Sequence, residues 1–161
     1  MKVATWWHLP LGPATAYSWR GDPDVPAFMD TDPIIVFDGV CVLCSGFVHW
    51  VIRRDRNKRF RFVSAQSLLG RAIYRHIGLP TEVFETNLLI SDGYIYGKSE
   101  AFFRIVERLG PPWLLLAMGR ICPQQLRTWL YDRIARNRYS LFGRTESCMI
   151  PTPDIAGRFL A

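Results

Sequence analysis

One stretch, residues 34–44, constrains the fold of this chain more than any other. It begins with four consecutive apolar residues, Ile34–Phe37, which predict a short strand buried on both faces. An Asp-Gly turn signal follows, and then Cys41 and Cys44 stand where an apolar pattern of helical spacing begins. We therefore expect a strand, a tight turn and a helix over residues 42–54, with the cysteines at the helix N-terminus.

A Cys-x-x-Cys pair in this position predicts thiol-disulfide chemistry. A thiolate is the species that attacks a disulfide, and the first turn of a helix stabilises it through unpaired backbone N–H groups and the macrodipole. Cys41 is the expected attacking thiol, and Cys44, on the same helix face, is the expected resolving thiol. Asp38 either caps the helix or accepts a proton from Cys44. Such an exchange needs no bound cofactor, only a thiol electron donor and a disulfide-bearing protein or small-thiol substrate.

Two other interpretations of the cysteine pair stay open. The pair is half of a zinc site, but zinc takes four ligands, and Cys122 and Cys148 are single and far away in sequence. The pair is otherwise an inert structural feature. In both cases the chain is a non-catalytic binding module with a basic docking face. The strand–helix context favours redox chemistry, and we assign no residue as a metal ligand.

The charge of the chain is unevenly distributed. The 161 residues, enough for one domain, carry a net charge of +6. Residues 53–61 hold six basic residues against one acidic residue, and residues 113–147 are rich in arginine. The simplest explanation is a solvated helix end with cations at the negative end of the dipole. A docking face for an acidic partner is the alternative, and we expect no nucleic acid because no nucleic-acid-binding motif accompanies the charge.

The N-terminal region gives no targeting signal. Trp6–Pro10 is not the apolar core of a secretory signal, and the later apolar run Trp113–Met118 is too short to cross a bilayer. We expect a cytoplasmic protein with no transmembrane span, in a compartment that keeps thiols reduced. Residues 1–32 contain four prolines and no periodicity, which predicts a flexible or loosely packed extension before a single domain at 33–161. Trp6, Trp7 and Trp19 are unusual for a disordered tail, so a docked segment is the alternative.

After the helix that carries the cysteines, apolar spacing and turn residues predict five further elements. They are a strand at 60–63, a helix at 66–77, strands at 87–90 and 94–96 joined by an Asp92-Gly93 turn, and a helix from Ser99 to Leu109. With the first strand and helix, this gives the βαβαββα order of an α/β, thioredoxin-like fold. In that fold the cysteines lie at the carboxyl end of a strand, where α/β sheets bind ligands.

A C-terminal helical extension is predicted from about residue 111. Apolar residues indicate a short helix at 113–120, and Pro123 suits the start of a second helix that ends near Arg136. We expect residues 137–143 to break the helical pattern. A further hypothesis is that the helices of 113–136 meet a membrane or a helical partner.

Several polar residues outside the motif are candidates for the site. Gln66, Ser67 and Ser99 stand at predicted helix starts, so they line the site or cap helices, and we favour capping. Cys122 follows an isoleucine and is most simply a buried small residue. Cys148 lies in a coil near the end of the chain and is a candidate third redox thiol if the tail folds back over the site.

The sequence also resembles a known family. Phe37-Asp38-Gly39-Val40-Cys41-Val42-Leu43-Cys44-Ser45-Gly46 is similar to the opening of the DCC family of predicted thiol-disulfide oxidoreductases, whose Asp-Cys-Cys motif is matched by Asp38, Cys41 and Cys44. Further matches lie at 65–67, 98–99, 135–139, 142–144 and 146–153. The resemblance covers about residues 33–160 and implies a bacterial-type, thioredoxin-like oxidoreductase without naming its substrate. One departure from the wider thioredoxin pattern is that Val83–Thr86, without a proline, precede the third predicted strand.

Overall fold

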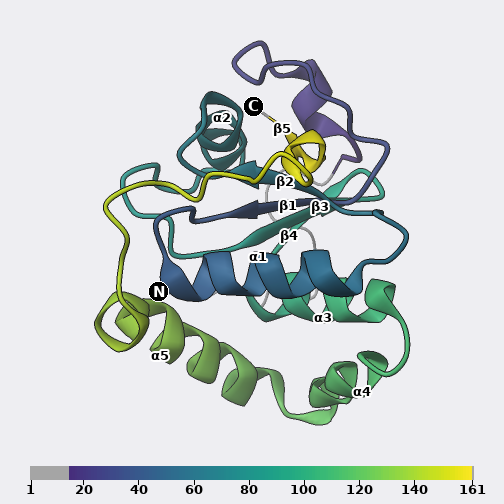
Figure 1. Cartoon of the computed structure of the whole chain (residues 1–161), viewed down its shortest axis with the longest axis vertical. Helices are drawn as coiled ribbons and strands as arrows, with labels where there is room; N and C mark the ends of the chain where they lie inside the picture. Colours follow the sequence, from purple (N-terminus) through teal and green to yellow (C-terminus); the bar gives the residue numbers. More distant parts are fainter. Residues whose placement is uncertain (1–14, 161) are drawn as a thin grey trace.

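A five-stranded sheet organises the computed structural model, which describes residues 15–160 (Figure 1). The strands are β1 Ile34–Phe37, β2 Arg61–Ser64, β3 Leu88–Ser91, β4 Tyr94–Gly97 and β5 Phe159–Leu160. The α-helices are α1 Val42–Arg54, α2 Leu68–His76, α3 Lys98–Leu109, α4 Leu114–Ala117 and α5 Gln124–Phe142. Short 3₁₀ helices occur at η1 Ser18–Gly21, η2 Met118–Ile121 and η3 Ala156–Arg158.

The strand order β4-β3-β1-β2-β5 confirms the expected thioredoxin-like α/β fold. β1 is parallel to β2 and antiparallel to β3, while the β3–β4 pair is an antiparallel hairpin. Its turn residues Asp92 and Gly93 have φ angles of 52° and 82°, the left-handed values that a two-residue hairpin of this kind requires. β1 is the central strand, and the chain leaves its carboxyl end directly into the segment that carries the cysteines.

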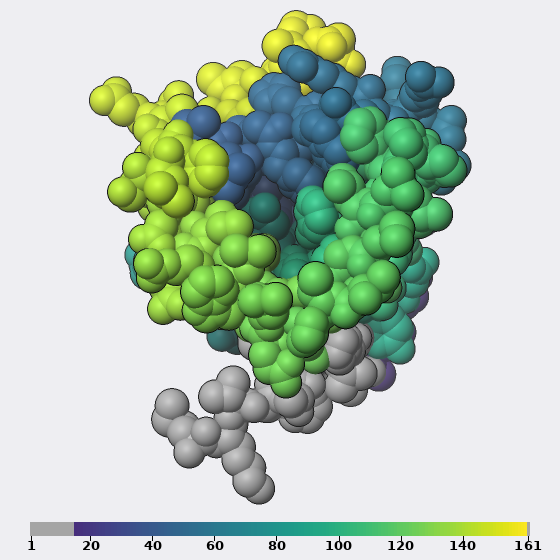
Figure 2. All heavy atoms as spheres, turned by 90° about the horizontal axis from the view of Figure 1, so that it is seen from below, coloured from purple at the N-terminus to yellow at the C-terminus, as the bar shows by residue number. Residues whose placement is uncertain are grey.

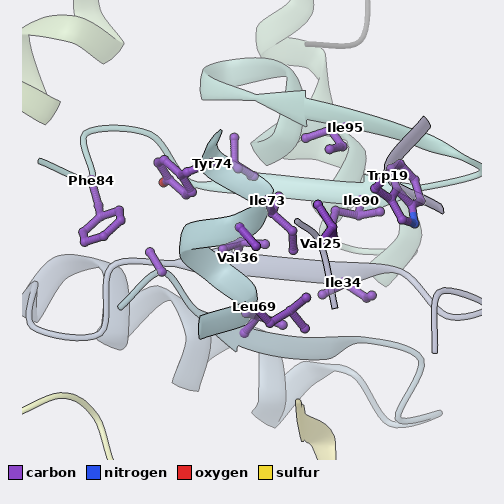
Figure 3. Close-up of a cluster of buried hydrophobic side chains, with 14 residues drawn as sticks. Trp19, Val25, Ile34, Val36, Leu69, Ile73, Tyr74, Phe84, Ile90 and Ile95 are labelled. Atoms are coloured by element: carbon purple, nitrogen blue, oxygen red, sulfur yellow. The ribbon is translucent and has the colours of Figure 1, made fainter. Parts of the chain in front are cut away.

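Helices cover both faces of the sheet, which explains why every residue of β1 is buried. Successive side chains of a strand point to opposite faces. Ile34 and Val36 therefore join the cluster beneath α2, which Figure 3 shows with Leu69 and Ile73. Ile35 and Phe37 pack against residues from α1 and α3 on the other face. α1 is thereby fixed along the sheet with its N-terminus at the end of β1.

The segment before β1 packs against the sheet instead of lying loosely. Trp19 and Val25 are buried in the same cluster as Ile34, and the Trp19 indole Nε1 donates a hydrogen bond to the Asp30 carboxylate at 2.9 Å. An indole buries a large apolar area and still finds a partner for its N–H, which explains why this proline-containing segment docks. Trp19 and Val25 thus agree with the docked alternative for this segment, and residues 1–14 lie outside the described part of the chain.

The C-terminal helix is longer than the sequence predicted. α5 continues to Phe142 instead of ending near Arg136, and Gly143, with φ 88°, terminates it. The prediction of a break at 137–143 was wrong because tertiary contacts of Arg138 and Tyr139 stabilise the last turns. Cys122 is exposed between η2 and α5, so the prediction that it is buried was also wrong.

None of the helices found between residues 15 and 160 combines the length and the apolar character needed to cross a bilayer.

We expect Arg158→Ala to destabilise the fold strongly. Arg158 forms a buried ion pair with Asp55 and donates to the Phe60 carbonyl, which ties η3 to the connection between α1 and β2. Removing it leaves the Asp55 charge buried and unpaired, at a cost of about 3–5 kcal/mol of unfolding free energy. Urea unfolding followed by tryptophan fluorescence measures this change. The matched control is Arg61→Ala at the more exposed Arg61–Asp32 pair, which should cost at most about 1 kcal/mol; equal losses would contradict the argument.

Candidate active site

The two cysteines lie at the first turn of α1, as the sequence predicted. Cys41 is the N-cap residue, with extended backbone angles of φ −82° and ψ 120°. Its Sγ accepts the backbone N–H of Cys44 at an N–S distance of 3.4 Å. The sulfur therefore takes the place that a serine or aspartate oxygen usually has at an N-cap. Asp38 is not the cap, so that half of its expected role was wrong.

The two thiols have opposite pKa shifts. A hydrogen bond from the Cys44 side chain, together with the Cys44 backbone N–H and the charge of Arg138, lowers the pKa of Cys41 to about 6 against the opposing effect of burial. The same hydrogen bond and burial raise the pKa of Cys44. The pair behaves as a unit in which the thiolate resides on Cys41 and the proton on Cys44. An attacking thiol and a protonated resolving thiol are thus both present at neutral pH.

Asp38 lies just before this turn and is completely surrounded by hydrogen-bond donors. Its Oδ1 accepts the Gln66 side-chain amide at 2.6 Å and the Val40 backbone N–H at 3.2 Å. Its Oδ2 accepts Arg138 Nη2 at 3.0 Å and the Tyr139 hydroxyl. A buried carboxylate is stable only when its charge is paired and its lone pairs are satisfied, and this cradle does both.

Arg138 connects three parts of the chain at the site. This buried side chain of α5 forms the ion pair with Asp38 and also donates to the Phe84 carbonyl at 2.8 Å. Phe84 belongs to the loop before β3, where the wider thioredoxin pattern has a cis-proline. Within residues 15–160 the cis peptide bond is at Pro111–Pro112, so no cis-proline faces the cysteines here. Arg138 instead fixes that loop relative to the turn after β1.

Sequence reasoning quoted Arg138 and Tyr139 as part of the family resemblance but gave them no role. The prediction that the helix ends near Arg136 placed them in irregular structure. A usable signal was present, because Arg138 lies seven residues after Tyr131 and thus on the same helical face. Tyr131 lies on the inner side of α5, where its hydroxyl accepts the Asn87 backbone N–H at 3.3 Å.

The three polar candidates have three different outcomes. Gln66 lines the site and is not the cap of α2, so the favoured capping role was wrong for it: besides its bond to Asp38, its Oε1 accepts the Gly39 N–H at 3.0 Å. Ser67 caps α2 by accepting the Gly70 N–H at 3.1 Å, as we favoured. Ser99 neither caps α3, whose N-cap is Gly97, nor has a described contact with the cysteines, so the capping prediction was wrong there.

A segment near the C-terminus, residues 143–149, lies over the cysteine turn, and we call it the covering segment. Thr145 N donates to the Val40 carbonyl at 2.9 Å, and Met149 N donates to the Gly39 carbonyl at 2.8 Å. Arg144 forms an antiparallel bridge with Cys41. The tail therefore does fold back over the site, the condition set for a third thiol, and Cys41 is 0% exposed beneath it.

Cys148 lies in the covering segment close to the turn. Its Sγ is 3.2 Å from Ser64 Oγ and 3.4 Å from Gln66 Oε1. A Cβ placed on Gly39 would lie 2.4 Å from this sulfur, so only glycine permits the approach. As for metals, residues 15–160 contain no group of three or more His, Cys, Asp or Glu side chains arranged to bind an ion.

Comparisons with known proteins point in one direction. Residues 35–144 match the family described as DCC1-like thiol-disulfide oxidoreductase. The chain is similar to the uncharacterised protein YuxK of Bacillus subtilis strain 168, with 40% identity over 127 residues, which are 79% of this chain and 93% of that protein. It is also similar to a chloroplastic DCC family protein of Arabidopsis thaliana, with 38% identity over 120 residues, which are 74% of this chain and 70% of that protein. No solved structure matches the chain.

We predict that Cys41 titrates near pH 6 and that Arg138→Gln raises this pKa. In the native protein the thiolate should form as pH rises through about 6, so that it predominates at pH 7. Losing Arg138 removes a nearby positive charge and leaves Asp38 unpaired, and both changes disfavour a second negative charge. The ultraviolet absorbance of the thiolate, followed against pH, measures both values.

The matched control is Arg133→Gln, an exposed arginine on the same helix, which should leave the titration unchanged. Urea unfolding of the Arg138 variant should show a loss of about 3 kcal/mol or more, the cost of leaving one member of a buried ion pair alone. A Cys41 pKa that is the same in the wild type and in a folded Arg138→Gln variant would contradict the assignment.

We also predict that Gly39→Ala opens the covering segment. The new methyl group overlaps Cys148 Sγ and crowds Gln66, so the segment must shift away from the turn. Alkylation of Cys41 should then become at least several-fold faster, measured by peptide mass spectrometry. Gly46→Ala on α1 is the control, because nothing lies within 4 Å of its Cβ position. Equal alkylation rates in the two variants would contradict the prediction.

Proposed function

Because the chain belongs to the DCC1-like thiol-disulfide oxidoreductase family, we propose that it exchanges a Cys41–Cys44 dithiol or disulfide with a protein or small-thiol partner. The observation that supports this most strongly is the arrangement at the first turn of α1. There the Cys41 sulfur accepts the Cys44 N–H, its pKa is lowered to about 6, and the proton is retained by Cys44. Thiol-disulfide exchange by attack and resolution requires this arrangement, with a thiolate on the attacking cysteine and a proton on the resolving cysteine.

In the proposed reaction the Cys41 thiolate attacks one sulfur of a substrate disulfide. The substrate S–S bond breaks, a mixed disulfide forms at Cys41, and the first substrate thiolate leaves. Cys44 then gives up its proton and attacks Cys41 Sγ, which releases the second substrate thiolate and leaves a Cys41–Cys44 disulfide. The substrate gains two electrons and the pair loses two, and a thiol electron donor restores the dithiol.

Asp38 has a positioning role in this proposal and is the candidate proton acceptor, since its charge acts on Cys44. Four donors occupy its two oxygens, so it can receive the Cys44 proton only if one of them withdraws. The four hydrogen bonds to the Asp38 carboxylate support a structural role, in which Asp38 fixes the turn that carries Cys41. The burial of Cys41 further implies that the covering segment moves before a substrate reaches the sulfur.

Cys148 is the proposed third thiol, because it lies in the covering segment and is half-buried beside the turn. Gln66 belongs to the same proposed site as a contact of both Asp38 and Cys148. We place the reaction in a reducing compartment such as the cytoplasm, where a dithiol of this kind is kept available. The Arabidopsis relative is described as chloroplastic.

A trapping experiment tests this function. In the Cys44→Ser variant, resolution is impossible, so a mixed disulfide with an oxidised small thiol should accumulate at Cys41, detected as a mass shift on its peptide. The Cys41→Ser variant should form none at Cys44. The matched control is Cys122→Ser, which removes an exposed cysteine away from the pair and should exchange like the wild type.

An equilibrium redox titration of the wild type should show one reversible two-electron transition of the Cys41–Cys44 pair. Cysteines that never pair in graded thiol buffers, together with no trapped adduct in the Cys44→Ser variant, would overturn the proposal and favour the binding-module alternative.

A further inference from the structure

A pocket lined by arginines lies at the far end of α1 from the cysteines. Its volume is about 510 Å³, and its walls include the guanidinium-bearing residues Arg53, Arg54, Arg56, Arg59 and Arg108 together with Trp113. Asp55 also lines it but is already paired with Arg158, and Arg108 is paired with Asp92. Within residues 15–160, the other four arginines have no carboxylate partner at ion-pair distance. An anion from outside the chain would relieve their mutual repulsion.

Exposed apolar side chains begin where this pocket ends. Trp113 lines the pocket and directly precedes α4, a single turn of leucines. Leu115 is 68% exposed and Ile121, at the end of η2, is 80% exposed. Large apolar side chains gathered on one exposed surface usually mark a site of interaction with a partner or a membrane.

One flank of α5 extends this apolar surface. Its inner side is fixed by contacts such as Arg127 over the Phe103 ring and Arg138 with Asp38. At 100° per residue, the exposed side chains of Leu126, Leu130 and Ile134 follow one another along the adjoining flank, and Trp129 lies on the outward side. Figure 2 shows the residues of α5 and of α4 on opposite sides of a hollow on the underside of the molecule. We call this face, with the arginine pocket at its edge, the α4–α5 surface.

The charge of this surface has one sign. Residues 110–142 contain a single acidic residue, Asp132, which is paired with Lys98. Arg133 and Arg136 are exposed on α5, and within the described chain neither forms an ion pair with a carboxylate. A second copy of the chain docked here would bring arginines against arginines. A layer of phosphate groups above a hydrocarbon interior complements both the cations and the leucines.

We propose that the α4–α5 surface docks the protein peripherally on a bilayer that contains anionic phospholipids. The leucines of α4 and the apolar side of α5 enter the interface, and the arginine pocket receives a headgroup phosphate. The pocket and the cysteines lie at opposite ends of a 13-residue helix, about 20 Å apart. The arginine pocket is therefore remote from the cysteine turn, and docking does not depend on the proposed thiol exchange.

Vesicle flotation tests the proposal with the full chain. We expect binding to vesicles of phosphatidylcholine mixed with phosphatidylglycerol, little binding to phosphatidylcholine alone, and a decrease with rising salt. A basic residue near an anionic surface raises the partition coefficient roughly fivefold, so Arg53→Gln/Arg56→Gln should lower it roughly thirtyfold. Arg75→Gln, an exposed arginine of α2, is the control and should retain binding.

A matched pair of leucine substitutions tests the apolar contribution to vesicle binding. Leu115→Ser should lower binding by about tenfold or more, the effect of losing one leucine from the interface. Leu68→Ser on α2 removes an even more exposed leucine, 83% exposed, from a different helix and should have no effect. Circular dichroism checks that each variant is folded.

Three results would overturn the proposal. The first is that the protein does not bind anionic vesicles, and the second is that Leu115→Ser binds them as well as the wild type does. The third is a concentration-dependent dimer, seen by light scattering, that Leu115→Ser abolishes, in a protein that does not bind vesicles. The last result would assign the surface to self-association. The trapping of a mixed disulfide at Cys41 is measured separately and is expected to be unchanged in all these variants.

Discussion

The buried ion pair between Asp38 and Arg138 is the interaction on which the rest of the site depends. Burying either charge alone costs several kcal/mol, so each residue is tolerated only because the other is present. The pair fixes the end of α5 against the turn after β1, and the second bond of Arg138 fixes the loop before β3 at Phe84. Gln66 completes the arrangement from the β2–α2 connection. Four separate segments are thus held at one carboxylate.

The electrostatics of the cysteine pair follow from this arrangement. The helix N-terminus and Arg138 favour a thiolate at Cys41, whereas burial and Asp38 oppose it. The decisive contribution is the hydrogen bond from Cys44, which lowers the pKa of one sulfur by raising that of the other. Since neither neighbour between the cysteines is charged, the charges that act on the pair, those of Arg138 and Asp38, come from outside the motif and add to the hydrogen bonds within it.

Local patterns predicted much of this structure. The buried strand at 34–37, the helix at 42–54 and the βαβαββα order all followed from apolar spacing, because each element covers a continuous face of the core. The Ser67 cap and the Asp92-Gly93 turn were also predictable, since both depend on contacts within three residues. Local rules failed where tertiary contacts determine the structure, as at the end of α5, which the contacts of Arg138 and Tyr139 extend to Phe142.

The contacts that complete the site are the ones that no local rule contains. Arg138 and Asp38 are 100 residues apart in sequence, and Cys148 and Ser64 are 84 apart. Closing loops of this length costs entropy that must be recovered by packing of the whole domain. In the unfolded chain Cys41 is an ordinary cysteine, with a pKa near 8.5. Folding of α1 supplies the hydrogen bonds from Cys44 that lower this pKa, and docking of α5 adds the charge of Arg138, so the chemistry of the motif is coupled to the fold.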